Sequence, residues 1–292
     1  MVAAAIPAPA PAPVRAAPAE PVRLPRSRCW DLLASGDPAR AHRLFLAWPE
    51  EPPPAGGYPL IVLLDANAAF ATAVESLRSQ ARRPEATGVT PAILLGIGYP
   101  TEAPTDRAGR TRDYTPAVTG APAGTGGADA FLDFVERELL PAVETEFPVD
   151  RARRAVFGHS LGGLLVLHTL FTRPGLFRRH AAASPSIWWE DRAVLRAAER
   201  FVAHPPPGAA RLGLLLTVGE LENGIVGADP ARLARQRERR MGANARNLAA
   251  WLLTLGSRGP QVSFVEFAGE NHASVVPAAL SRALRFSLEP SV

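Results

Sequence analysis

Short apolar runs alternate with helical patterns along most of this chain, and this alternation limits the possible folds more than any other feature. Apolar runs bounded by glycine, proline or aspartate are typical of buried parallel strands. Strand and helix in alternation predict an α/β fold of the α/β-hydrolase kind, with a doubly wound, mostly parallel sheet flanked by helices. The expected strands are 42–46, 60–64, 92–97, 155–157, 212–218 and 262–267, with one more near Ala182; the expected helices are 129–146, 161–171, 230–255 and 276–288.

The basic composition does not indicate a nucleic-acid partner. All 32 basic side chains are arginine, which explains a high isoelectric point at a formal net charge of only +4. Most of that net charge falls within residues 1–28, so we expect no basic face on the remainder. The apolar runs are far shorter than the roughly 18 residues of a membrane helix, and we expect no membrane partner.

The first 28 residues are rich in alanine and proline and predict a disordered leader, followed by one domain over residues 29–292. Proline interrupts the apolar stretch that a secretion signal would need, which favours a cytoplasmic location, with the periplasm as the open alternative. One cysteine excludes a disulfide framework.

The segment from Gly158 to Gly163 predicts a nucleophile elbow. It follows the expected strand 155–157 and precedes a strongly apolar helix, which is the context that a GxSxG motif requires. The turn would lift the Ser160 hydroxyl above the sheet and place the Leu161 amide at a helix N-terminus, where it could stabilise an oxyanion.

A serine nucleophile needs a base, and His272 is the best placed of the six histidines. It lies in a loop after the strand 262–267 and before the last helix. For the carboxylate that orients the base, the turn after the strand 212–218 offers Glu222, with Glu220 as the alternative. The second oxyanion donor is expected from the backbone amide of Asn67, in the turn after the strand 60–64.

With these residues in place, the chain resembles the α/β-hydrolase esterases of the enterochelin and salmochelin esterase type, within the putative esterase group that includes esterase D. The resemblance runs from about Arg40 to the C-terminus. It rests on LLDAN at 63–67, RDYTP at 112–116, FLDFVERELLPAVETEFPVD at 131–150, GHSLGGLLVLHTLF at 158–171, SPSIWW at 184–189, VGELE at 218–222 and ENHASVVP at 270–277.

The resemblance implies a serine carboxylic-ester hydrolase that works without cofactor or metal, with Ser160 as nucleophile and His272 as base. The implied substrate is a small-molecule ester, in the best-known members a cyclic trilactone carrying catechol groups, as a free or iron-loaded siderophore. Some members use a serine and histidine dyad, which leaves the role of Glu222 open. The chain also has Ala66 where the family commonly has glycine.

An anionic catecholate would suit arginines beside aromatic rings. We expect such a rim from a loop with Arg110, Arg112 and Tyr114 and from Trp188 and Trp189 after the strand near Ala182. The alternative is that Arg112 forms a structural ion pair with Asp113 and that the tryptophans pack beneath the next helix. The arginines of the stretch 230–255 are expected on a solvated helix outside the site.

Three alternative functions remain. One is a general carboxylesterase acting on small acyl or aromatic esters. Another is an acyltransferase that uses the same acyl-enzyme. The third is a non-catalytic siderophore-binding protein on a hydrolase scaffold.

Overall fold

The structure is a computed structural model that describes residues 21–34, 40–224 and 229–289. Residues 1–20 of the expected leader lie outside the described residues. The first strand begins at Ser27, just before the expected start of the domain.

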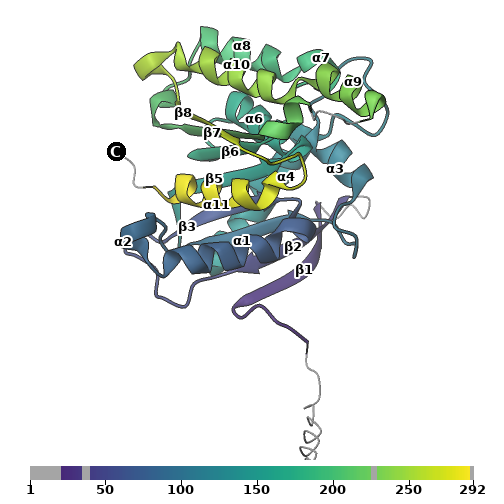
Figure 1. Ribbon diagram of the computed structural model, residues 1–292. Coiled ribbons are helices and arrows are strands. Elements are labelled where there is room, and N and C mark those ends of the chain that lie inside the picture. The colour runs from purple at the N-terminus through teal and green to yellow at the C-terminus, as the bar shows by residue number, and fades with distance from the viewer. Residues whose placement is uncertain (1–20, 35–39, 225–228, 290–292) are drawn as a thin grey trace, which may run out of the picture.

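One twisted sheet forms the centre of the molecule (Figure 1). Within the described residues it has eight strands, in the order β1-β2-β4-β3-β5-β6-β7-β8. The pairs β1–β2 and β2–β4 are antiparallel, and every other pair is parallel. The strands are β1 (Ser27–Leu33), β2 (Ala41–Ala47), β3 (Tyr58–Leu64), β4 (Ile93–Gly98), β5 (Val149–His159), β6 (Arg179–Ala183), β7 (Gly213–Gly219) and β8 (Gln261–Phe267).

Helices cover both faces of the sheet. They are α1 (Ala66–Ala81), α2 (Pro84–Thr87), α3 (Arg107–Tyr114), α4 (Ala128–Phe134), α5 (Leu140–Glu146), α6 (Leu161–Thr172), α7 (Trp189–Arg192), α8 (Val194–Ala203), α9 (Pro230–Arg239), α10 (Met241–Leu253) and α11 (Val275–Leu288). A π-helical turn, Val135–Leu139, joins α4 to α5, and 3-10 turns span Ala209–Arg211, Glu220–Asn223 and Gly256–Arg258. No helix in the described ranges is both long and apolar enough to cross a bilayer.

Two apolar layers hold these helices to the sheet. Successive side chains of a strand point to opposite faces, so Val62 and Leu64 pack on one side while Ile61 and Leu63 pack on the other. The first layer contains α4, α6, α8 and α10, and the second contains α1 and α11. Figure 1 shows α1 and α11 lying beside each other across one face.

The predicted fold is confirmed, and the expected strands and helices are present with three differences. The stretch 230–255 is two helices, because Arg240 adopts a left-handed conformation (φ 48°) between α9 and α10. The segment containing Arg110 and Tyr114 is helix α3 and not a loop. Its N-cap is Asp106, whose side chain accepts a hydrogen bond of 2.9 Å from the Gly109 amide. The strand β1 and the helices α1, α2, α7 and α8 match none of the expected ranges.

Candidate active site

Ser160 lies on a tight turn between β5 and α6, at the carboxyl edge of the sheet. Its backbone has φ 61° and ψ −115°, a strained conformation for a residue with a side chain. A Cβ atom at position 158 would lie 2.4 Å from the Gly162 carbonyl group, so only glycine permits the turn there. The Ser160 amide donates to the Ala183 carbonyl at 2.9 Å, which ties the turn to the end of β6.

His272 and Glu222 come together from two different loops. The distance from His272 Nδ1 to Glu222 Oε2 is 2.7 Å. The other carboxylate oxygen, Glu222 Oε1, accepts from the Ser184 hydroxyl at 2.6 Å and from the Gly219 amide at 2.7 Å. Burial opposes ionisation of the carboxyl group, but the hydrogen bonds from these three groups outweigh it and lower the pKa of Glu222. The site therefore holds a carboxylate against the imidazole.

Glu220, the alternative acid, has a different position. Its carboxylate accepts a hydrogen bond of 2.8 Å from the Gly269 amide, at the start of the loop that carries His272. The Leu221 amide donates to the Glu270 carbonyl at 3.0 Å and fastens the same loop. Glu222 is thus the carboxylate in contact with the imidazole, whereas Glu220 supports the backbone of the histidine loop.

Ser160 and His272 line the same cavity, which has a volume of about 180 Å³. The Ser160 hydroxyl lies 3.3 Å from the hydroxyl of Ser186, another residue of the cavity wall. Hydrogen bonds between nucleophile and base are often long before substrate binds and shorten in the reacting complex. The cavity thus brings together a serine, an imidazole and the carboxylate behind that imidazole.

His159 also approaches this site, although its place directly before Ser160 predicts a side chain that points elsewhere. Its ring centroid lies 4.5 Å from that of His272, with the planes tilted by 41°. Burial, followed by repulsion from His272, lowers the pKa of His159 to about 3. A neutral His159 ring therefore supports the His272 ring at neutral pH without competing for its proton.

The two expected oxyanion donors both begin helices. Leu161 is the first residue of α6, and Asn67 is the second residue of α1; amides at such positions have no acceptor within their own helix. The Asn67 side chain holds the turn instead: it donates to the carbonyls of Tyr99 and Thr101, both at 2.9 Å, and accepts from the Tyr99 amide at 2.8 Å. This leaves the backbone amide as the candidate donor at Asn67.

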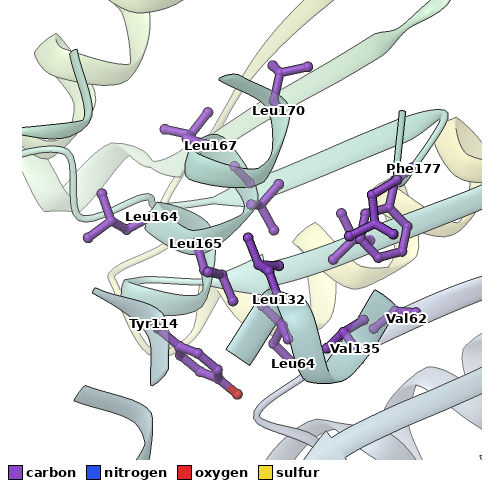
Figure 2. Packing of buried hydrophobic residues seen from close by; sticks show 14 of the residues in the cluster. Val62, Leu64, Tyr114, Leu132, Val135, Leu164, Leu165, Leu167, Leu170 and Phe177 are labelled. Atoms are coloured by element: carbon purple, nitrogen blue, oxygen red, sulfur yellow. The ribbon is translucent and has the colours of Figure 1, made fainter. Parts of the chain in front are cut away.

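Arg110, Arg112 and Tyr114 were expected to bind substrate, but the structure does not place them in the wall of this cavity. Tyr114 is fully buried, and Figure 2 shows it near Leu64 and Leu165 in the core. Arg110 pairs with Asp65 through two contacts of 2.9 Å. Arg112 pairs with the buried carboxylate of Asp113 at 2.7 Å, which is the ion pair expected if Arg112 has a structural role. Carboxylates within the fold hold both guanidinium groups, and none of the three side chains lines the cavity.

The two tryptophans have different surroundings, and only one of them lines the cavity. Trp188 lines the catalytic cavity, whereas Trp189 packs against the apolar core, as the alternative reading of the sequence has it. The guanidinium group of Arg239 lies over the Trp188 ring at 4.4 Å from its centroid. Trp188 is therefore the only one of the five expected substrate-binding residues that the described structure places in the cavity wall.

Two arginines of α9 line the cavity, contrary to the expectation that this helix lies outside the site. Arg235 and Arg239 border both the catalytic cavity and an adjoining cavity of about 600 Å³, whose wall also contains Arg192 and Arg240. Spacing of four residues on a helix places Arg235 and Arg239 on one face, a signal that was present in the sequence. In the described ranges, no group of three or more His, Cys, Asp and Glu side chains is arranged to hold a metal ion.

A strained serine at the carboxyl edge of a mostly parallel sheet, in the same cavity as an imidazole backed by a carboxylate, is the arrangement of an α/β-hydrolase. The family model described as putative esterase matches residues 35–249, and the chain belongs to that family of carboxylic ester hydrolases.

Known relatives match most of the chain. Ferri-bacillibactin esterase BesA of Bacillus subtilis is 40% identical over 269 residues, 89% of each chain. A siderophore enterobactin esterase of Emericella nidulans is 38% identical over 252 residues, which are 77% of this chain and 80% of the relative. Among solved structures, the BES protein of Bacillus cereus superposes with a TM-score of 0.83 at 36% identity, covering 94% of this chain and 98% of its own.

Proposed function

We propose that this enzyme hydrolyses the ester bonds of a siderophore trilactone, with Ser160 as nucleophile, His272 as base and Glu222 as the acid of a triad. The observation that carries the proposal is the 2.7 Å contact between His272 and Glu222 beside a cavity that Ser160 also lines. Relatives matched over most of their length carry siderophore esterase names, which supports the choice of substrate.

The chemistry would proceed through an acyl-enzyme. The Ser160 hydroxyl attacks the ester carbonyl while His272 accepts its proton, and Glu222 stabilises the resulting imidazolium. The tetrahedral intermediate collapses, the carbon–oxygen bond to the leaving alcohol breaks, and His272 returns the proton to that alcohol. Water then attacks the acyl group by the same route, releasing the acid and restoring the serine.

Charge stabilisation of the tetrahedral intermediate would come from backbone amides. We assign Leu161 and Asn67 as the two donors, since each lies in the first turn of its helix and both helices start at the carboxyl edge of the sheet. Two preorganised amides need no reorganisation as the oxyanion forms, which is the reason such sites accelerate acyl transfer.

The wall formed by Trp188, Arg235 and Arg239 would hold the ligand. Coordination of ferric iron by three catecholates leaves a net negative charge, whereas the iron-free catechols are neutral at pH 7. Guanidinium groups bind anions and stack on aromatic planes, so this wall favours the iron-loaded ligand over the free one. The iron here is part of the substrate.

The three alternatives are less favoured than this proposal. A general carboxylesterase does not account for the arginines that line the cavity. A non-catalytic binding protein does not account for a strained serine with an imidazole and carboxylate at hand. An acyltransferase would need to exclude water, and supplying an alcohol acceptor to the acyl-enzyme would reveal transfer products. The cytoplasmic location remains a prediction from the sequence.

A substrate panel tests the proposal directly. Purified protein is offered ferric and iron-free tricatecholate trilactones beside neutral p-nitrophenyl esters, and products are separated by liquid chromatography. We expect the highest kcat/KM for the ferric trilactone, with release of the linear trimer or its fragments. Better turnover of simple esters than of either trilactone would overturn the siderophore assignment.

A further inference from the structure

Asp65 occupies the turn between β3 and α1, directly before the segment that supplies an oxyanion amide. Its backbone is left-handed, with φ 52° and ψ 42°. Aspartate adopts this conformation more readily than most side-chain-bearing residues, but it is still uncommon and is kept where contacts hold the residue in place. The contacts that hold Asp65 in this conformation therefore help to set the position of the Asn67 amide.

Two side chains of α3 hold Asp65, one at its carboxylate and one at its backbone. Arg110 Nε and Nη2 donate to Asp65 Oδ1 and Oδ2, each at 2.9 Å, in a bidentate pair. The Asp65 amide donates to the Tyr114 hydroxyl oxygen at 3.2 Å. Arg110 and Tyr114 are four residues apart on α3 and share a face, so one helix holds both parts of Asp65.

The same guanidinium group reaches the nucleophile elbow. Arg110 Nη2 lies 3.4 Å from the His159 carbonyl oxygen, on the residue before Ser160. A Cβ atom at position 162 would lie 3.4 Å from Asp65 Oδ2, which places the carboxylate against the first turn of α6. An unpaired carboxylate at this place would oppose formation of an oxyanion nearby, since like charges repel strongly where water is excluded.

Arg110 is held in its charged form. Burial opposes the charge of the guanidinium group, but the hydrogen bonds and the charge of Asp65 outweigh burial and raise the pKa of Arg110. Its side chain is only 16% exposed and does not line the catalytic cavity. These facts argue against direct contact between Arg110 and substrate.

We propose that Arg110 is a positioning residue for the oxyanion site, because it joins the turn that carries Asn67 to the elbow that carries Leu161 and neutralises the carboxylate between them. This inference rests on the proposed role of Ser160 as nucleophile. Arg110 would then act on kcat for every ester, charged or neutral, and would leave substrate affinity unchanged.

The test uses a neutral ester, p-nitrophenyl butyrate, and the rate at which a fluorophosphonate labels Ser160. Arg110→Met is expected to lower kcat and the labelling rate about a hundredfold, with KM within about threefold of wild type, because small displacements in such sites are costly. Arg110→Lys keeps the charge but loses the bidentate geometry. Its kcat and labelling rate should lie between those of Arg110→Met and wild type. The control is Arg107→Met, an exposed arginine on the same helix, which should match wild type.

The double variant Arg110→Met/Asp65→Asn adds a readout that a purely structural role would not produce. Because the double variant lacks the unpaired Asp65 carboxylate, its kcat should be about tenfold higher than that of Arg110→Met alone. If Arg110→Met does not fold, Arg110→Gln, which is also neutral, with and without Asp65→Asn gives the same comparison.

Wild-type kcat in the folded Arg110 variants would overturn the inference, as would a rise in KM confined to anionic esters. An active wild-type enzyme is required for either result. Failure of the fluorophosphonate to label wild-type Ser160 would instead refute the proposed catalytic function, and the inference with it.

Discussion

Two pairs of arginines, one on α3 and one on α9, differ in what holds them. On α3, Arg110 and Arg112 are paired with carboxylates of the fold, and neither lines the cavity. On α9, Arg235 and Arg239 border the cavity, and the described part of the chain shows no ion pair at either residue. The first pair is held within the fold, whereas the second lines the cavity.

The difference shows that the role of an arginine near a catalytic motif, structural or ligand-binding, follows from its counter-ion. Its distance from the motif in the sequence does not indicate that role. A guanidinium group with a bidentate carboxylate partner has little remaining capacity to bind an anion. We therefore expect buried, paired charges to affect kcat and stability, and open charges to affect the affinity for anionic substrates alone.

The largest effect is expected from Glu222→Gln, which removes a buried charge that acts on all substrates. The amide cannot stabilise the imidazolium and favours the wrong tautomer of His272, so kcat should fall by about 10³- to 10⁴-fold for neutral and anionic esters alike. Steady-state kinetics on both ester types measures the loss. Glu220→Gln is the matched control, with a loss below about tenfold; equal losses in the two variants would contradict the assignment of the acid.

The double variant Arg235→Ala/Arg239→Ala tests the open pair. Loss of charge-assisted contacts should raise KM for a ferric tricatecholate lactone between about ten- and a hundredfold. KM for a neutral p-nitrophenyl ester should stay within about twofold. Arg237→Ala, an exposed arginine of the same helix outside both cavities, provides the control. An equal rise in KM for both substrates would contradict the claim that the α9 arginines act only on anionic substrates.

Arg112→Met should reduce stability and leave substrate affinity unchanged. The buried Asp113 carboxylate would keep its contacts with His42 and Tyr99 but lose the guanidinium group. The free energy of unfolding should fall by about 1 to 3 kcal/mol, measured by urea denaturation. A selective rise in KM for the anionic substrate would return Arg112 to the ligand site.

His180 is a buried base that the fold keeps neutral, in contrast to the arginines of α3, which stay charged beside carboxylates. Burial lowers its pKa to about 3, against about 6.5 in an unfolded chain. Between these values the unfolded state binds a proton that the folded state does not, so stability decreases as pH falls. From pH 6.5 to 5.5 this residue should account for about 1 kcal/mol of lost stability.

The variant His180→Leu should reduce that loss. Urea denaturation at the two pH values measures the difference for wild type and variant, so a uniform change in stability cancels. An identical pH dependence in both proteins would show that His180 binds protons equally in the folded and unfolded states, contrary to this account.

Local patterns in the sequence sufficed for seven of the eight described strands and for the loops that carry the candidate catalytic residues. Glycine at 158 and 162, a strand before and an apolar helix after them predict the elbow, because that turn is determined by neighbours in the chain. The contact of His272 with Glu222 is consistent with the expected order of serine, acid and histidine.

The positions of the arginines could not be predicted in the same way. Arg110 is turned inward by Asp65, which lies 45 residues away along the chain. Nothing within α3 distinguishes that position from one that faces a ligand. The start of α3 did have a local signal, since Asp106 precedes Gly109 at the spacing of an N-cap.

The most direct test of the catalytic assignment is mass spectrometry of the protein quenched during turnover of a slowly deacylating p-nitrophenyl ester. We expect one acyl group per chain, located on Ser160 by peptide mapping, and neither adduct nor turnover in Ser160→Ala. An adduct on another residue, or ester turnover that survives Ser160→Ala, would contradict the assignment.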